Sequence, residues 1–301
     1  MLELKNEKVA IPVVLFAGLI WSFGPLVVRY MNDPHLVPWQ YIFGRGLTIF
    51  VVLNLYLFFE EGKNFYKNYY KIGYSGVIGG TGLGIAMISF IYSITNTSAA
   101  VTLLCLAAMP FFTALLGFLF LRERISINVW IAIFIATVGI VIIALGNTAK
   151  ASLVGLVFGI TSSIGFSVFS VSLRWRKETP KFTTVAFAGF FCFTLATIFI
   201  LSGDQPFFST SYNGTLFSLH GVLVCMGLIL YSIGSKAIPA AELTLLSLTE
   251  VIGGIFWVWL PWFGINEIPT TNTIIGGFFL FISITYYSLI MRTNRRFIGP
   301  N

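Results

Sequence analysis

Ionisable side chains inside long apolar stretches are the residues most able to do chemistry in this sequence. Glu250 lies about ten residues into the apolar stretch 241–263. If that stretch is a membrane-crossing helix, a rise of about 1.5 Å per residue puts Glu250 roughly 15 Å deep, near the midplane. A carboxylate is costly there, so Glu250 is a candidate to bind a cationic group or to take up a proton. The alternative is a structural carboxyl group, protonated or hydrogen-bonded to a neighbouring helix end.

Two further ionisable residues lie nearer to the ends of apolar stretches. Arg45 is about seven residues into the stretch 38–59, and it could pair with a carboxylate or a phosphate. Alternatively, its side chain reaches the interface or ties helices together through backbone carbonyls. Glu242 lies near the start of its own stretch, and we interpret it as a gate or interfacial residue.

Aromatic and small polar residues could complete a binding site around these charges. Trp21 and Trp257 could form an aromatic wall for an amine, because a cation is attracted to the face of an indole ring. Tyr92 and Tyr231 lie near the ends of their stretches and offer polar tips to a cavity or a gate. Ser247 is a small polar neighbour of Glu250 that leaves room for water or a solute. Packing or interfacial roles are the alternative for the aromatic residues.

Glycine and proline residues mark places where helices could approach closely or bend. Gly76, Gly80 and Gly84 recur every four residues and so share one helix face that permits close backbone contact. The string Gly-Thr-Gly-Leu-Gly in this stretch lacks the preceding strand and the lysine of a nucleotide-binding loop. Pro25 and Pro110 lie inside apolar stretches, where each removes a backbone hydrogen bond and favours a kink.

The composition identifies the medium in which these elements must fold. Hydrophobic residues make up 57% of the 301 residues and charged residues only 10%, whereas soluble domains carry about 25% charged residues. The mean hydropathy is +0.90. Lipid must therefore surround most of the chain, and helices are the expected spanning elements because they satisfy their own backbone groups. The expected spans are 9–29, 38–59, 70–94, 98–120, 126–145, 152–174, 183–201, 215–236, 241–263 and 272–291.

Lysine and arginine predict how these spans are oriented. With ten spans, the two termini and the loops after even-numbered spans share one side, and 15 of the 18 basic residues fall there. The opposite side holds only Arg29 and Lys150. Because basic loops stay in the cytoplasm, we expect both termini to be cytoplasmic and the location to be a bacterial plasma membrane. The basic residues on the cytoplasmic side are Lys5, Lys8, Lys63, Lys67, Lys71, Arg122, Arg124, Arg174, Arg176, Lys177, Lys181, Lys236, Arg292, Arg295 and Arg296.

The two halves of the chain align with each other when Ala99-Ala100 is placed on Ala240-Ala241. Each of these pairs opens a long apolar stretch after a very short turn. Each half also has a glutamate near the end of its fourth span, Glu123 and Glu267, once a short insertion in the second half is allowed. We therefore predict two repeats, 1–147 and 148–301.

Five spans in each half place the second repeat upside down in the membrane. Inverted repeats of this kind are typical of secondary transporters, which bind their solute near the midplane between the repeats. In the same alignment Glu250 falls on Met109, beside Pro110. We therefore expect these residues to meet near the centre.

Short patterns in both halves stand out: Trp21 to Pro25, Arg45, Ala99-Ala100, Met109-Pro110, Leu121-Arg122-Glu123-Arg124, Ala240-Ala241 and Thr249-Glu250-Val251. They resemble one family, the EamA-type transporters of the drug/metabolite transporter superfamily. This chain has Arg122 where the family usually has Gly, and Val251 where it often has Pro. The resemblance implies ten helices in two inverted repeats around a central cavity, lined by the first, third, fourth, sixth, eighth and ninth helices.

The expected function is therefore secondary transport of a small organic metabolite by alternating access. One intramembrane glutamate and one arginine favour a zwitterionic or cationic solute, such as an amino acid or an amine, with protons as a candidate coupling ion. A larger anionic solute, such as a nucleotide sugar, is the alternative, and it is disfavoured because only Arg45 could meet it. No cofactor or metal and no nucleic-acid partner is expected, and both a monomer and a homodimer remain open.

Two other classes of function compete with transport. An intramembrane enzyme would need a metal cluster, paired aspartates or a serine–histidine site. His35 and His220 are the only histidines, and no HExxH motif is present. The other class is a membrane receptor or assembly subunit without flux. Transport by the purified protein in liposomes separates all three.

The topology is testable with a reporter that is active only outside the cytoplasm. Fused after Asn301, it should stay silent, because ten spans return the C-terminus to the side of the basic loops. Reporter activity at this position would mean that one span is missing or in excess.

Overall fold

The computed structural model describes residues 6–123, 125–147, 152–176 and 178–294, and their regular structure is entirely helical. The long helices are α3 (Pro38–Glu61), α5 (Gly73–Asn96), α8 (Ile127–Asn147), α9 (Leu153–Trp175), α10 (Lys181–Ser202), α11 (Ser211–Gly234) and α14 (Thr271–Asn294). The shorter ones are α1 (Glu7–Trp21), α2 (Gly24–Arg29), α4 (Lys67–Lys71), α6 (Ala99–Leu106), α7 (Met109–Leu116), α12 (Ala240–Leu246) and α13 (Thr249–Trp259).

The prediction of an all-helical membrane protein with about ten spans is confirmed. Nine segments of the described chain are long and apolar enough to cross a membrane. The tenth apolar helix, Ile127–Ile142 within α8, is shorter by the same measure. The observed ends lie within about four residues of the expected ones. Hydrophobicity locates the middle of a span well and its first and last residues less precisely. The predicted repeat boundary at 147/148 adjoins residues outside the described part, and it stays a prediction.

Three of the spans are interrupted near their middle, where continuous helices or kinks were expected. The first breaks between α1 and α2, the fourth between α6 and α7, and the ninth between α12 and α13. Pro25 and Pro110 lie in the first turns of α2 and α7, where the missing N–H has no helical partner to lose. The third break has no proline. There, the hydroxyl of Ser247 donates to the Thr244 carbonyl, and this competes with the regular helix.

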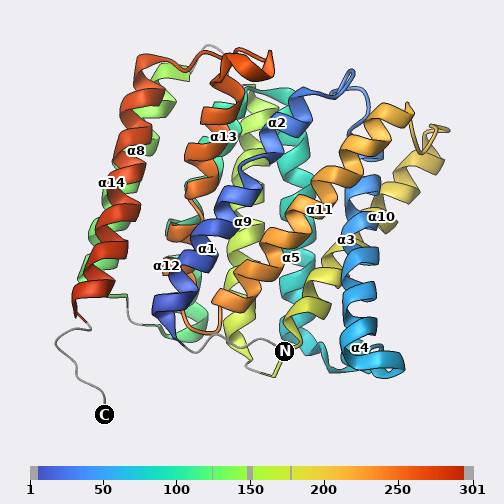
Figure 1. Ribbon diagram of the computed structural model, residues 1–301, viewed down its shortest axis with the longest axis horizontal. Coiled ribbons are helices and arrows are strands. Elements are labelled where there is room, and N and C mark those ends of the chain that lie inside the picture. The colour runs from blue at the N-terminus through green and yellow to red at the C-terminus, as the bar shows by residue number, and fades with distance from the viewer. Residues whose placement is uncertain (1–5, 124, 148–151, 177, 295–301) are drawn as a thin grey trace.

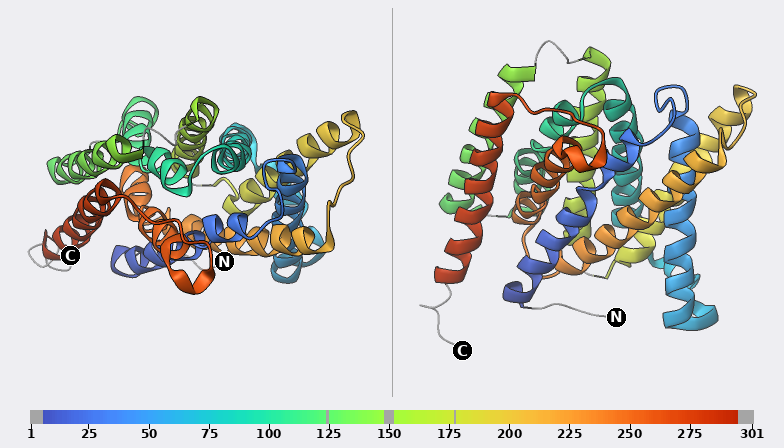
Figure 2. Two further views of the ribbon diagram at one scale, coloured as in Figure 1. Left: turned by 90° about the horizontal axis from the view of Figure 1, so that it is seen from above. Right: turned by 45° about the horizontal axis from the view of Figure 1, so that its top comes forward.

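The interrupted spans lie in the middle of the bundle. Figure 1 and Figure 2 show α8 and α14 as a pair at one edge, and α3 and α10 at the opposite edge. Between them, α5 packs against α9 and α10, while α1 packs against α11 and α13. The middle of the molecule is therefore where the ends of the interrupted helices meet.

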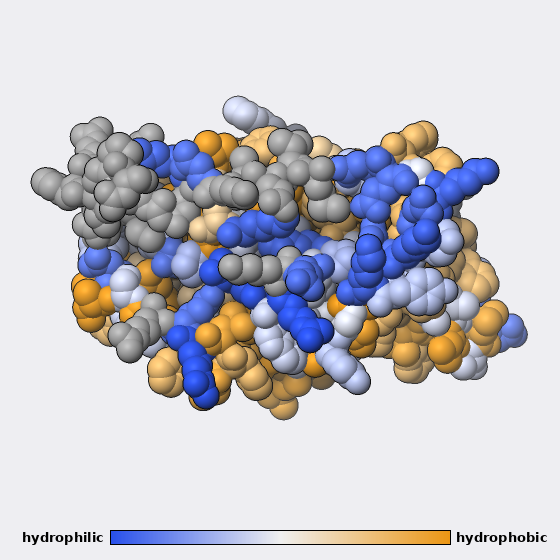
Figure 3. Space-filling model, turned by 90° about the horizontal axis from the view of Figure 1, so that it is seen from below, coloured by the Kyte–Doolittle hydropathy of each residue, from blue (hydrophilic) through white to orange (hydrophobic). Residues whose placement is uncertain are grey.

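Two faces of the molecule, at opposite ends of the helices, would meet water. The described start of α1 and end of α14 lie on the same face, the lower one in Figure 1, which we call the terminal face. Hydrophilic residues gather across its middle and hydrophobic ones along its sides (Figure 3). The face at the other end of the helices is called the far face, and Arg29 lies there at the end of α2. Lys5, Arg124, Lys150, Lys177, Arg295 and Arg296 of the topology argument lie outside the described residues.

The repeating glycines of α5 face α10. A Cβ atom added at Gly80 would lie 2.6 Å from Cδ1 of Phe187 and 2.9 Å from the Thr184 carbonyl oxygen. One added at Gly76 would meet the Thr184 hydroxyl at 2.9 Å, and one at Gly84 would meet the Phe191 ring. The absence of side chains on this face lets the two helices approach closely.

Replacing Gly80 with Leu should separate α5 from α10 and destabilise the fold by about 1–3 kcal/mol, as overpacking commonly does. Gly277→Leu is the matched control, because a Cβ atom there has nothing within 4 Å. Thermal unfolding in detergent should show a clear loss for Gly80→Leu and little change for Gly277→Leu. A Gly80→Leu protein as stable as the control would show that α10 does not pack on this face.

Candidate functional site

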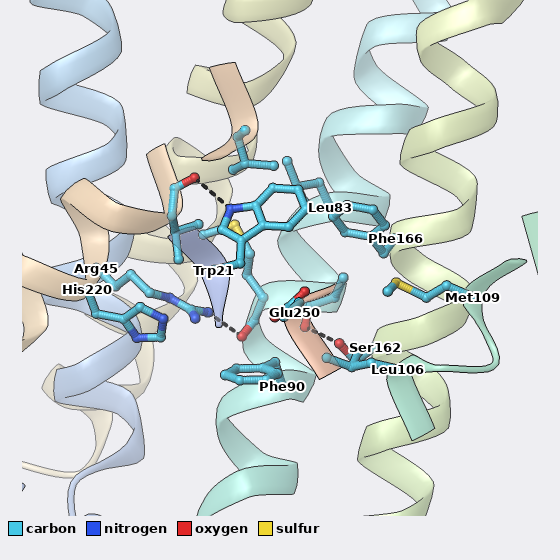
Figure 4. Close-up of a pocket in the computed structure, with 14 residues that line it drawn as sticks. Trp21, Arg45, Leu83, Phe90, Leu106, Met109, Ser162, Phe166, His220 and Glu250 are labelled. Atoms are coloured by element: carbon cyan, nitrogen blue, oxygen red, sulfur yellow. Dashed lines mark hydrogen bonds between the residues drawn. The ribbon is translucent and has the colours of Figure 1, made fainter. Parts of the chain in front are cut away.

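A cavity of about 70 Å³ lies in the middle of the bundle, among the interrupted spans (Figure 4). Its walls come from α1, α3, α5, α6, α7, α9, α11 and α13, so both predicted repeats contribute. The lining residues are Trp21, Arg45, Leu83, Ala86, Met87, Phe90, Leu106, Met109, Ser162, Phe166, His220, Val224, Leu228 and Glu250.

Glu250 is the acidic group of the cavity. It is the second residue of α13, so the break before this helix turns its side chain and a helix N-terminus toward the cavity. A carboxylate is favoured at a helix N-terminus. Among the described residues, no basic side chain lies within 4.0 Å of it and no side-chain hydrogen bond to it is formed. Its charge is therefore open to a partner from the cavity.

Arg45 is the basic group of the same cavity, and only 2% of it is exposed. One guanidinium nitrogen, Nη2, donates to the Met87 carbonyl. The centres of the Tyr41 and Phe90 rings lie 5.8 and 6.0 Å from its Cζ atom, which is within reach of cation–π attraction. Its Nε has no hydrogen-bond partner among the described residues. The cation is thus only partly compensated by neutral groups.

Trp21 forms an aromatic wall of the cavity. Its indole nitrogen donates to the Val224 carbonyl at 3.2 Å, which fixes the ring. The ring fits against α11 because position 227 is glycine: a Cβ atom there would lie 2.6 Å from Cε2 of the indole. Phe166 meets Trp21 edge-on with ring centres 5.6 Å apart. Tyr231 lies behind Trp21 at 5.4 Å, outside the cavity, and its hydroxyl is hydrogen-bonded to that of Ser170 at 2.6 Å.

His220 is a cavity residue that the sequence patterns did not place in the site. Its Nδ1 is hydrogen-bonded to the Tyr41 hydroxyl, and the side of the ring with Nε2 lies against Gly24 at the start of α2. Figure 4 shows it beside Arg45. The signal that could have found it is its position in the middle of an apolar span, where a polar ring is as unusual as Glu250 is.

Met109 lines the cavity from the start of α7, as expected from its alignment with Glu250. The backbone around it is held by serines of α9. Ser167 donates to the Met109 carbonyl at 3.1 Å, and Ser163 donates to the Cys105 carbonyl. These hydroxyls add hydrogen bonds to carbonyls at the α6–α7 break, where the Cys105 carbonyl also accepts from the Ala108 N–H at 3.2 Å, and they tie the break to α9.

Two aromatic candidates lie outside the cavity. Trp257 donates to the Ser22 hydroxyl at 2.8 Å and stacks on Phe23 at 4.6 Å, so it braces the α1–α2 break and does not face Trp21 across a site. Tyr92 packs against Phe158 and Trp39.

Two polar candidates, which belong to α12 and its C-terminal cap, also lie outside the cavity. The Ser247 hydroxyl is fully buried and bonded within its own span. The Glu242 carboxylate is buried and accepts a hydrogen bond from the Tyr287 hydroxyl, which joins α12 to α14.

Comparisons with known proteins agree with the fold. The model of the EamA-like transporter family matches residues 8–145. A solved crystal structure superposes with a TM-score of 0.73 over 96% of this chain and 99% of that chain, at 16% identity. At that identity the likeness shows the fold.

Relatives at the sequence level are named as transporters. An "Uncharacterized transporter" of Helicobacter pylori strain J99 is 27% identical, over 82% of this chain and 84% of its own length. The "Pseudopaline exporter CntI" of Pseudomonas aeruginosa is 25% identical, over 69% of this chain and 71% of its own. With the apolar helices and the shared fold, these similarities identify the chain as a multi-pass membrane protein whose residues 8–145 match the EamA-like transporter family.

Proposed function

We propose that this protein is a secondary transporter that binds a small zwitterionic or cationic organic metabolite, such as an amino acid or an amine, in the central cavity. The observation that carries this proposal is that Glu250 and Arg45 face the same small cavity from different predicted repeats. A site between repeats is suited to alternating access, because rocking one repeat against the other opens it to either side in turn.

Glu250 is the group that selects a cation. A carboxylate in the middle of a membrane protein is costly unless it is neutralised, and no described basic side chain pairs with it within 4.0 Å. An ammonium group of the solute would neutralise it, and so would a proton in the solute-free state. Exchange of one for the other would couple solute movement to protons.

Arg45 extends the selection to zwitterions. Its guanidinium is suited to a carboxylate, and the Trp21, Phe90 and Phe166 rings offer apolar contact to the rest of the solute. The cavity volume of about 70 Å³ is small beside the roughly 300–1,000 Å³ of a typical drug-sized ligand site. Both the size and the acidic group disfavour a nucleotide sugar. By the distribution of basic residues, we further propose that the terminal face is cytoplasmic.

The central test is Glu250→Gln, which keeps the size of the side chain and removes its charge. A thermal-shift screen of metabolites on the purified protein first identifies a stabilising solute, and uptake into liposomes then measures transport. Glu250→Gln should fold but lose most of the transport, or lose its pH dependence if protons drive the cycle. Glu250→Asp should retain part of the activity.

Glu178→Gln is the matched control, because it makes the same change at an exposed carboxylate on the terminal face. It should transport as the unmodified protein does. A well-folded Glu250→Gln protein with unchanged rate, affinity and pH profile would overturn the assignment of Glu250.

Arg45→Gln tests the class of solute. Loss of a charge partner for the carboxylate should weaken binding of an amino acid by at least about 30-fold, because truncating a buried charge pair commonly costs about 2 kcal/mol or more. Binding of the matching amine, which lacks the carboxylate, should change far less. Isothermal titration with both ligands measures this, with Arg176→Gln as the exposed control. Equal losses for both ligands would mean that Arg45 has only a structural role.

A further inference from the structure

Two arginine–glutamate ion pairs lie at opposite faces of the molecule. At the far face, Nε of Arg29 lies 2.5 Å from Oε1 of Glu267. At the terminal face, Nε of Arg174 lies 2.6 Å from Oε1 of Glu123. Each pair is partly exposed, with side-chain exposures of 18% and 31% at the far face and 26% and 22% at the terminal face. Water can therefore rehydrate the charges if a pair separates, which keeps the cost of separation modest.

Both arginines also hold the end of a neighbouring helix. Arg29 donates to the Ile94 and Thr97 carbonyls, each at 3.1 Å, at the end of α5. Arg174 donates to the Ser235 and Ile238 carbonyls at 3.2 and 2.9 Å, after the end of α11. We call each set of contacts a clamp: the far clamp is formed by Arg29 and the terminal clamp by Arg174.

The carbonyl acceptors of the two clamps are counterparts under the predicted repeat, whereas the arginines are offset by about one helical turn, since the same alignment places Arg29 on Ser170. The alignment that places Ala99 on Ala240 also places the carbonyl acceptors of the far clamp on those of the terminal clamp, Ile94 on Ser235 and Thr97 on Ile238. The two glutamates correspond as well, once the short insertion before the second one is allowed. Each face thus carries the same kind of contact: an arginine, a glutamate from the other predicted repeat, and carbonyls at the end of a neighbouring helix.

Each clamp joins one predicted repeat to the other through segments that line the cavity. Arg29 ends the interrupted span that carries Trp21, and Glu267 follows the span that carries Glu250. Arg174 is near the end of α9, which contributes a phenylalanine ring to the cavity, and Glu123 follows α7, which contributes a methionine. Separating either clamp would therefore release the cavity walls at one face while the other face stays joined.

The far clamp also borders a second hollow. Glu267 lines a pocket of about 460 Å³ at the far face, together with Ser98, Asn266 and Thr270. This hollow is larger and more polar than the central cavity. It would bring water and solute next to the Arg29–Glu267 pair.

We propose that the far clamp and the terminal clamp are the two gate locks of the transport cycle, and that they open in alternation. The proposal rests on the transport function proposed above, and both locks are closed in this structure. Opening the far clamp exposes the cavity to the far face, and opening the terminal clamp exposes it to the terminal face.

The test uses a single cysteine as a reporter of access to the cavity. Ser162→Cys places it in the cavity lining, in a background in which Cys105, Cys192 and Cys225 are replaced by alanine. A membrane-impermeant methanethiosulfonate reagent is applied to right-side-out and to inverted vesicles. Glu267→Gln should raise the labelling rate about fivefold or more from the far face only, since loss of about 1 kcal/mol shifts an equilibrium by that factor. Glu123→Gln should raise it from the terminal face only.

Matched controls remove a carboxylate at each face without separating the repeats. At the far face, Asp204→Asn changes an exposed residue in the loop after α10. At the terminal face, Glu61→Gln changes the last residue of α3, which accepts a hydrogen bond from Asn68 of its own predicted repeat. Neither should change labelling. Arg29→Lys and Arg174→Lys are milder variants that keep the charge but cannot bond the glutamate and both carbonyls at once. Arg29→Lys should shift labelling in the same direction as Glu267→Gln, and Arg174→Lys in the same direction as Glu123→Gln.

Opposite shifts for the two locks support the proposal. It is overturned if both locks shift labelling toward the same face, if neither does, or if the controls shift it equally. It is also overturned if all four lock variants fail to accumulate while the controls do, because the clamps would then be structural ties. The labelling needs no solute, so its result is independent of whether Glu250→Gln abolishes transport.

Discussion

The structure depends on one constraint: within a bilayer there is no water to satisfy a backbone group or a charge, so the protein must do it. Interrupting three spans opens a central site and breaks the regular backbone pairing there, so side-chain donors supplement it. Serines of α9 serve the α6–α7 break, where they donate to the Cys105 and Met109 carbonyls. Arginines serve the helix ends at both faces in the same way. Two charged groups face the cavity: Arg45, whose Nε has no hydrogen-bond partner among the described residues, and Glu250, which has no basic side chain within 4.0 Å among them. Unpartnered buried oxygens of the described chain also occur away from the cavity, on Gln40, Thr113, Thr183, Ser232 and Ser288.

The features that follow from hydrophobicity and from the repeat could be predicted from the sequence. Apolar length located the spans to within a few residues, because it reflects the thickness of the membrane. The depth of Glu250 and its alignment with Met109 predicted that both would lie at the centre, and both line one cavity there. The departure from the family pattern at Arg122 also has a local meaning. Its φ is 54°, a left-handed backbone conformation that the glycine usual in the family would adopt at low cost.

Features that depend on the rotation of a helix about its axis could not be predicted. Trp257 was expected to form an aromatic wall with Trp21, but its ring contacts Ser22 and Phe23, because it lies about two turns beyond Glu250 along α13, beside the α1–α2 break. The position of His220 within an apolar span is its one sequence signal. No spacing pattern links it to the site, because its hydrogen-bond partner Tyr41 comes from α3, far away in the chain. The serine donors of α9 resemble ordinary small residues until their carbonyl partners are known. Composition and spacing therefore predict which residues are deep, and only the packed structure shows which way they point.

An experimental structure with a solute bound tests the central claim most directly, namely that the cavity between the two predicted repeats is the solute site. The protein is prepared with a solute that stabilises it, and the position of the bound molecule is determined by crystallography or electron cryo-microscopy. The account predicts the ammonium group of the solute beside Glu250, with any carboxylate directed toward Arg45 and the apolar part against Trp21. A solute bound in the far-face hollow beside Asn266 and Thr270, with an empty central cavity, would contradict it.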